Sequence, residues 1–242
     1  MRIALISDLH GNELALKAVL AQIAQRGVDQ IVCLGDVATL GPQPEAVMEL
    51  LEKSAAVCIL GNHDEFMLDE ALVHGYTKIP VLVEAIDWCR QRLTADSFAL
   101  IRSFRRTLEL ALENGDRLLA FHGTPESNMT DLLATTPPDE VDELLNGRSA
   151  SLMVGGHTHL QMLRQHRGIL LVNPGSVGMP FKVHCAGGPP EVLPHAEYAI
   201  VCSTTASTSV TLHRVALDKT SLRNAARAVD NPLCASLAQM YS

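Results

Sequence analysis

Apolar runs and amphipathic stretches alternate through the first quarter of the chain. Residues 3–6 and 31–34 are short and almost wholly apolar, as expected of strands in the middle of a sheet. Between them, apolar positions recur at helical spacing up to Gly27, and a second helix is predicted from Pro44. Residues 55–60 form a third apolar run. This alternation predicts parallel strands joined by crossover helices.

The remainder of the chain predicts further helices and strands. Residues 66–105 are mainly helical by their apolar spacing, and Asn114-Gly115 between two apolar runs indicates a hairpin over 107–121. Residues 124–148 are polar and are expected to be a loop with one short helix. Strands are predicted at 152–154, 169–172, 198–202 and 210–214, before a helix over 221–229.

These late strands have an antiparallel style, so we expect them to form a second sheet packed on the first. The predicted class is therefore α/β, with two packed sheets flanked by helices. The sequence shows no internal repeat and no low-complexity linker, and residues 1–242 are expected to form a single domain.

Composition allows a large core and narrows the possible partners. Of the 242 residues, 47% are apolar and 19% are charged, which is far from a disordered composition. The net charge of −8 argues against a protein that grips a long nucleic acid, which needs a basic stripe. A small anionic substrate stays possible because bound cations reverse the local charge. Oligomeric state is left open.

The spacing of the cysteines and the lengths of the apolar runs predict the cellular compartment of the protein. The six cysteines are scattered with no C-x-x-C pair, so we expect reduced thiols in the cytosol. No apolar run approaches the length of a membrane helix, about 20 residues. The N-terminal run is too short for a signal peptide and is interrupted by Asp8. We therefore expect a cytoplasmic protein that does not enter a membrane.

Five polar clusters carry the candidate chemistry, and four of them follow an apolar run directly. They are Asp8-Leu9-His10-Gly11-Asn12, Gly35-Asp36, Gly61-Asn62-His63-Asp64, His122-Gly123 and Gly155-Gly156-His157-Thr158-His159. Ligands bind beyond the carboxyl ends of parallel strands, so the first three clusters are predicted to meet at one sheet edge. Residues two apart in an extended chain point the same way, so the Asp-x-His and His-x-His pairs can each aim at one site.

These side chains match the ligands of divalent transition metals. Carboxylate, imidazole and amide oxygen together suit manganese, iron, zinc or nickel, and the absence of cysteine disfavours a structural zinc site. A single histidine near a strand end is more often a surface or hydrogen-bonded residue, and an aspartate there is often a helix cap. Five of the ten histidines fall in the clusters, however, and this coincidence favours a metal site. Asp36 is a candidate bridge between two ions.

The ordered motifs D-L-H-G-N, G-D, G-N-H-D, H-G and G-H-T-H resemble those of the calcineurin-like metallophosphoesterase superfamily. Asn173-Pro174-Gly175-Ser176 also resembles a segment of its small bacterial phosphodiesterase-like branch. The resemblance implies an αββα sandwich and two metal ions bridged by Asp36. The implied ligands are Asp8, His10 and His159 for one ion, and Asn62, His122 and His157 for the other.

The resemblance also implies catalytic roles for two neighbouring residues. His63 would sit beside the metals and assist the departing oxygen, and Asp64 would orient His63. A histidine that titrates near the working pH is a plausible general acid. The implied reaction is in-line attack on phosphorus by a metal-activated hydroxide.

Three functions remain open. The favoured one is hydrolysis of a phosphodiester of a small molecule or nucleotide. The second is phosphomonoester hydrolysis, including protein phosphatase activity, which the same metals could serve. The third is a non-catalytic interaction scaffold, against which the presence of His63 and all seven implied ligands argues.

Substrate choice is expected to depend on segments outside the metal core. The candidates are residues 66–105, 124–148 and 177–197. Where relatives often carry arginine and acidic residues, the third segment is Gly/Pro-rich and apolar, with only Lys182 as a nearby cation. Its expected apolar wall consists of Met179, Phe181, Val183 and Tyr198. Such a wall suits the organic leaving group of a diester better than a highly charged monoester.

Overall fold

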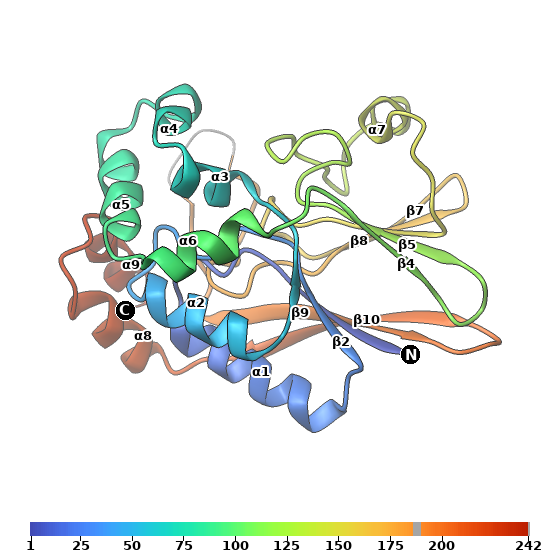
Figure 1. Cartoon of the computed structure of the whole chain (residues 1–242), viewed down its shortest axis with the longest axis horizontal. Coiled ribbons are helices and arrows are strands. Elements are labelled where there is room, and N and C mark those ends of the chain that lie inside the picture. Colours follow the sequence, from blue (N-terminus) through green and yellow to red (C-terminus); the bar gives the residue numbers. More distant parts are fainter. Residues whose placement is uncertain (186–189, 242) are drawn as a thin grey trace.

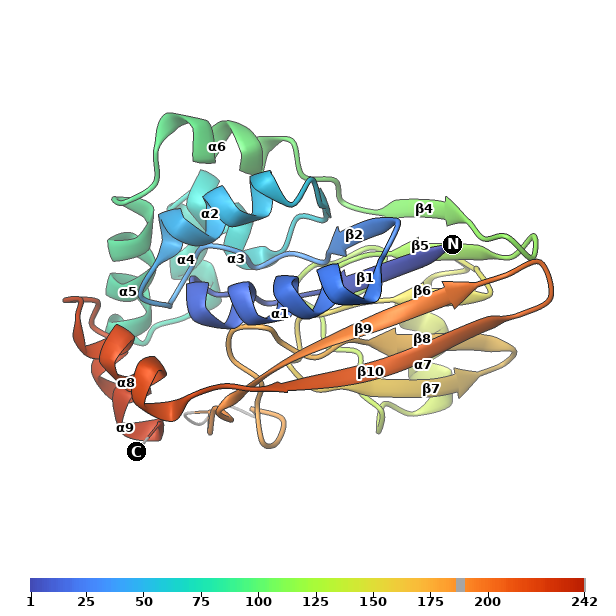
Figure 2. The ribbon, with the colours of Figure 1, turned by 90° about the horizontal axis from the view of Figure 1, so that it is seen from below.

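Two five-stranded sheets pack against each other and carry helices on their outer sides (Figures 1 and 2). The computed structural model describes residues 1–185 and 190–241. The predicted sandwich of two mixed sheets flanked by helices is confirmed. Residues 186–189, part of the expected specificity segment 177–197, lie outside the described residues.

The first sheet has the strand order β10-β9-β1-β2-β3. Its strands are β1 (Arg2–Ile6), β2 (Gln30–Cys33), β3 (Val57–Cys58), β9 (His195–Ser203) and β10 (Thr208–Ala216). The strands β1, β2 and β3 are parallel, whereas β9 runs antiparallel to β1 and β10 antiparallel to β9. The expectation that the last two strands belong to a second sheet is therefore wrong.

The strand β9 lies inside the first sheet because both of its faces are apolar. Tyr198 and Ile200 pack in the core beneath the helices, and Ala199 and Val201 pack in the core between the sheets. The same alternation occurs in β1. A strand buried on both faces cannot lie on an open surface, so the end of the chain returns beside its beginning.

The second sheet has the order β4-β5-β6-β8-β7. Its strands are β4 (Leu108–Ala111), β5 (Arg117–Ala120), β6 (Leu152–Val154), β7 (Met162–His166) and β8 (Ile169–Asn173). The expected β4–β5 hairpin is present, and β5, β6 and β8 are parallel. The sequence did not reveal β7, an edge strand with an exposed Leu163 and little apolar pattern.

Helices cover the outer faces and one end of the sandwich. They are α1 (Glu13–Arg26), α2 (Pro44–Lys53), α3 (Asn62–Leu68), α4 (Ala71–Tyr76), α5 (Pro80–Arg90), α6 (Ala95–Arg102), α7 (Pro138–Leu145), α8 (Lys219–Arg227) and α9 (Cys234–Met240). The helix α9 was not predicted; its buried Leu237 belongs to a separate apolar cluster with α8 and Met179. Among the described residues, no helix is long and apolar enough to cross a membrane.

A shared core holds the two sheets in a fixed relation. Ile3 and Leu5 of β1 pack with Leu118 of β5 and Leu152 of β6, all with 2% exposure or less. Burial of such side chains contributes about 1.5–3 kcal/mol each. The packing brings the carboxyl ends of the parallel strands of both sheets to adjoining edges, where the polar clusters lie.

Candidate metal centre

The loops that follow five strands meet at this edge and are joined by backbone hydrogen bonds. The N–H of Asp8 donates to the carbonyl of Gly35 at 2.9 Å, and the N–H of His10 donates to the carbonyl of Asp36 at 3.0 Å. From the second sheet, the N–H of Gly156 donates to the carbonyl of His122 at 2.7 Å. These bonds connect the loops after β1 and β2, and those after β5 and β6. Backbone pairing therefore fixes where the clusters stand.

Five candidate ligands adopt left-handed backbone conformations. Nine described non-glycine residues have positive φ; the five at this site are Asp8 (53°), His10 (43°), Asp36 (60°), His157 (69°) and His159 (57°). The prediction of an extended chain through the Asp-x-His and His-x-His pairs is therefore wrong. A left-handed conformation costs roughly 1–2 kcal/mol per residue, and aspartate and histidine adopt it more often than most. The surrounding structure must hold these loops against that cost.

One cluster, the inner group, consists of Asp8, His10 and His159, all buried. The Nε2 atoms of His10 and His159 are 3.1 Å apart, and Asp8 Oδ1 lies 3.4 Å from His159 Nε2. The Nδ1–H of His159 donates to the carbonyl of Met179 at 2.6 Å. This bond leaves the Nε2 lone pair of His159 directed at the other two ligand atoms.

A second cluster, the outer group, consists of Asp36, His122 and the partly exposed His157. Asp36 Oδ2 lies 3.4 Å from His122 Nε2 and 3.9 Å from His10 Nε2. This carboxylate oxygen thus stands between the two groups, where a bridging ligand would have to be. Asn62 Oδ1 lies 3.2 Å from His122 Nε2, which places the amide with the outer group.

The donor set fits a pair of cations. Asp8 Oδ1 is buried without a hydrogen-bond partner, and it faces imidazole nitrogens whose protons are on the far side of the ring. Lone pairs packed this closely repel one another unless a positive charge lies between them. Atoms that share one ion at about 2.0–2.2 Å lie about 3.0–3.5 Å apart. The four separations within the two groups, 3.1 to 3.4 Å, agree with that range, whereas Asp36 Oδ2 and His10 Nε2 are 3.9 Å apart.

The electrostatics of the centre also favour positive charge. Burial opposes protonation of His122, but the Asp36 carboxylate outweighs it and raises the pKa of His122 to about 10. Burial opposes ionisation of Asp8, but the neighbouring His159 lowers the pKa of Asp8 to about 2. In the metal-free protein, the carboxylates raise the pKa of His122 and of His159, whereas burial lowers the pKa of His10 and of His157. A divalent cation supplies positive charge at the same atoms.

His63 stands beside both groups without joining either. Its ring lies edge-on to His10 with centroids 5.1 Å apart, and its Nδ1 is buried without a hydrogen-bond partner. Burial lowers the pKa of His63 to about 4. The expectation that His63 titrates near neutral pH is therefore wrong for the metal-free protein, because its ring lies among other histidines and away from water.

Asp64 acts on the backbone and makes no hydrogen bond to the His63 ring among the described contacts. Its carboxylate accepts the N–H groups of Asp36, Val37 and Gly61 at 2.8–2.9 Å. Burial and the nearby Asp36 raise the pKa of Asp64 to about 7, against these three bonds. Gly61 is required there, since a Cβ on it would lie 2.1 Å from Asp36 Oδ1. Any orientation of His63 by Asp64 must therefore be indirect, through this turn.

All three expected specificity segments contribute side chains beside the metal centre. Tyr76, from 66–105, contacts His63 with ring centroids 5.7 Å apart. Asp131, from 124–148, lies 3.5 Å from His157 Nε2. Phe181, from 177–197, stacks on His159 at 4.1 Å. We call Tyr76, Asp131, Phe181 and His184 the rim.

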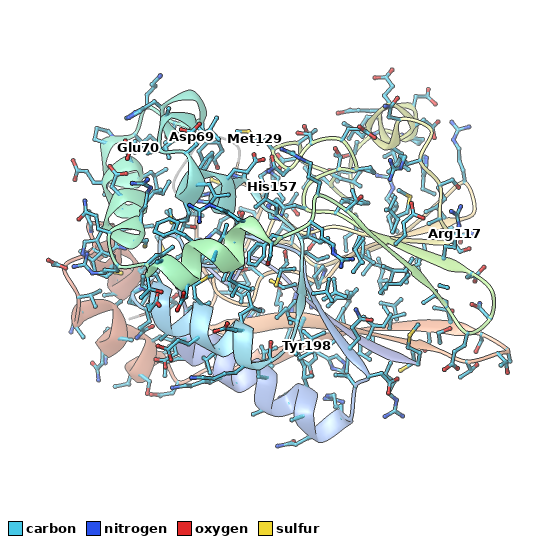
Figure 3. All side chains as sticks on the ribbon, in the orientation of Figure 1. Asp69, Glu70, Arg117, Met129, His157 and Tyr198 are labelled. Carbon is cyan, nitrogen blue, oxygen red and sulfur yellow. The ribbon has the colours of Figure 1, made fainter. Side chains whose placement is uncertain are left out.

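The expected apolar wall is only partly present. Phe181 contacts the centre and Val183 is exposed, but Met179 is buried with α8 and α9. Tyr198 is on the far side of β9, where its hydroxyl bonds to Gln22, and Figure 3 shows it well away from His157. The expected cation, Lys182, is paired with Glu191 at 3.0 Å. No motif identified Tyr76 or Asp131 as site residues, because both lie outside the five polar clusters in the sequence.

The chain matches a known superfamily and two curated proteins over most of its length. Residues 1–187 match the model of the calcineurin-like phosphoesterase superfamily domain. The chain is 30% identical over 193 residues to an uncharacterised protein of Methanocaldococcus jannaschii, covering 74% of this chain and 76% of that one. It is also 30% identical over 193 residues to phosphodiesterase YfcE of Escherichia coli, covering 74% and 81% respectively.

A solved structure extends the likeness over the whole fold. The metallophosphoesterase of Sphaerobacter thermophilus superimposes with a TM-score of 0.75 and 26% identity, covering 99% of this chain and 100% of that one. The superposition includes β9 and β10, which lie beyond the part of the chain that matches the superfamily domain.

Proposed function

This chain belongs to the calcineurin-like phosphoesterase superfamily, and from that membership and the site geometry we propose that it hydrolyses a small-molecule or nucleotide phosphodiester with two divalent transition-metal ions. The observation that carries the proposal is the position of Asp36. Its Oδ2 lies 3.4 Å from an outer-group nitrogen and 3.9 Å from an inner-group nitrogen. One carboxylate is thus in reach of both cation positions.

In this proposal the inner group holds one ion, the outer group with Asn62 holds the other, and Asp36 bridges them. The ions would be manganese, iron, zinc or nickel, which accept this mixture of imidazole, carboxylate and amide ligands. When bound, such a pair supplies a nucleophile at neutral pH and charge stabilisation for the phosphoryl oxygens. The protein's part is to fix the ligands, which the left-handed loops and their backbone bonds do.

His63 is the proposed donor to the departing oxygen. His63 is buried, with 7% of the residue exposed, and its ring stands beside His10 of the inner group. With a pKa near 4 it is neutral in the metal-free protein at pH 7, and a neutral imidazole can still donate its N–H. An anionic phosphate beside the ring raises its pKa, because opposite charge favours the protonated form. Substrate binding would thus prepare His63 to transfer a proton.

The rim favours a diester over a monoester. Tyr76 and Phe181 place aromatic rings beside His63 and His159, which suits an organic leaving group. Asp131 adds negative charge next to His157 and opposes the second charge that a monoester carries near neutral pH. YfcE, a relative at 30% identity, is named a phosphodiesterase.

The test compares an aryl phosphodiester with the matching aryl monoester at equal pH and saturating metal. We expect a higher kcat/KM for the diester. A preference for the monoester by about tenfold, or 1.4 kcal/mol of transition-state discrimination, would reject diester hydrolysis and favour the phosphomonoesterase alternative. Hydrolysis of neither, with any of the four metals, would favour the scaffold alternative.

We also infer a cytoplasmic location, since the described cysteines form no disulfide.

A further inference from the structure

The four histidines of the two groups differ in what holds the side of the ring that faces away from the centre. His10 Nδ1 lies 3.1 Å from Thr39 Oγ1, and His122 Nδ1 donates to the carbonyl of Leu34. His159 Nδ1 donates to the carbonyl of Met179. All three partners belong to buried residues and carry no charge. Such partners fix the tautomer and the orientation of a metal-binding imidazole.

His157 has a different kind of partner. Its Nε2 faces Asp131 Oδ1 at 3.5 Å, so the partner is a carboxylate and the ring nitrogen involved is the opposite one. The Asp131 side chain is 44% exposed. Its other oxygen, Oδ2, lies 2.9 Å from Nε2 of His184. His184 belongs to segment 177–197 and Asp131 to segment 124–148, so the pair also joins two parts of the rim.

We propose that Asp131 is the positioning residue for His157, turning the Nδ1 of that ring toward the outer ion, and that His184 holds Asp131 in place. The inference rests on the proposed two-ion site and concerns how its outer half is built. A carboxylate behind an imidazole raises the basicity of that ligand and fixes its tautomer. The inner ion would then depend on buried neutral partners, and the outer ion on an exposed ion pair.

Two consequences follow for metal binding. Loss of Asp131 weakens the outer ion selectively, because no inner-group ring touches it in the described contacts. Loss of His184 weakens the same ion by less, since it acts through Asp131. The Asp131→Asn variant retains an oxygen facing His157 Nε2 but loses the charge, so its effect falls between those of Asp131→Ala and the wild type.

The experiment measures Mn²⁺ binding to the full chain by calorimetry, after chelation and dialysis. The variants are Asp131→Ala, Asp131→Asn and His184→Gln. The control is Asp139→Asn, which removes an equal charge from a 94% exposed carboxylate on α7. We expect Asp131→Ala to weaken one of two ions by about 10–100-fold, and the control to bind as wild type. Metal-free variants should melt as the metal-free wild type does.

A second readout separates positioning from direct ligation. The absorption bands of the Co²⁺-loaded Asp131→Asn protein should keep their wild-type positions, because the ligand set is unchanged. Shifted bands would make Asp131 a ligand and overturn the inference. So would wild-type affinity for both ions in Asp131→Ala. A wild type that binds two ions but hydrolyses no ester would overturn the proposed function alone, whereas one that binds no ion would overturn both.

Discussion

The inner and outer groups use similar ligands in different surroundings. Every inner-group residue is buried, and each of its histidines is held by a buried partner. The outer group includes His157, whose side chain is 11% exposed and whose partner Asp131 is 44% exposed. The inner group is thus determined by the packed fold, whereas the outer group depends in part on exposed side chains at the surface.

Because of this difference in burial, the two groups should respond differently to changes at the protein surface. A buried ligand set is preorganised and loses little when the surface changes. An open one can be altered by changes in the surrounding segments, since Asp131 and His184 come from two of the three segments expected to govern substrate choice. Asp36 links the two, because its carboxylate reaches a nitrogen of each group. Variation at Asp131 and His184 can therefore change the outer site without disturbing the inner one, whereas variation at Phe181, which stacks on His159, would reach the inner group.

The largest expected effect comes from a substitution that weakens the inner and outer groups together. Asp36→Asn removes the charge shared by both groups, so both ions should bind more weakly. Loss of several kcal/mol of charge stabilisation corresponds to a rate reduction on the order of 10⁴-fold. Elemental analysis and kcat/KM measured together would check this. Full occupancy of both sites in the variant would contradict the bridging role.

Next in size is a change that should leave both groups intact. His63→Ala removes a ring that contacts His10 but belongs to neither ligand set. We expect kcat to fall by on the order of 10²–10⁴ while metal content stays at the wild-type level. Wild-type turnover would contradict the donor role. A parallel loss of metal would instead make His63 a structural part of the centre.

A smaller effect sharpens the contrast between the groups. Stepwise addition of a chelator should remove the outer ion first, because its group is the more exposed. An ion present at 100 times its Kd stabilises the fold by about 2.7 kcal/mol, so each loss should lower Tm by about 5–10 °C. Calorimetric scans at increasing chelator should show two steps. Asp131→Ala should bring the first step to lower chelator, and a single unchanged step would contradict the ordering.

The stability of the chelated, metal-free protein should depend on pH through the protonation of His122. The pKa of His122, raised to about 10 by Asp36, exceeds its unfolded value of about 6.5. Protonated His122 therefore stabilises the metal-free fold fully below pH 6.5, and this contribution is lost as pH rises through 10. Tm of the chelated protein should fall over that window, and loaded protein should not show the loss. Asp36→Asn provides the control, since it removes the cause.

The fold was largely predictable because each central strand carries its own apolar run. Residues 3–6 and 152–154 were identified from local pattern alone and lie in β1 and β6, and the predicted strand 31–34 overlaps β2 with a shift of one residue. The neighbours of each strand in the sheet were not predictable. The apolar pattern of β9 shows that both of its faces are buried, but it does not show that β9 pairs with β1. Pairing between strands at opposite ends of the chain leaves no local signal in the sequence.

The polar clusters were visible because ligand types recur after strands, and the structure gathers them at one edge. The backbone conformations of these clusters were not predictable, because residues that directly follow a strand are usually expected to remain extended. The pKa of His63 depends on burial among other rings, which spacing does not reveal. Tyr76 and Asp131 belong to the site only through the folding of long connections, and no motif surrounds them.

The inner group draws ligands from both sheets, and His10 and His159 are 149 positions apart in the chain. An ion held there is therefore a cross-link that closes a very long loop. Cross-links of that span restrict the unfolded chain by about 4–5 kcal/mol in the simplest entropy model. Such an ion can bind only after the two halves of the protein have come together. Metal uptake would then be a late event in folding.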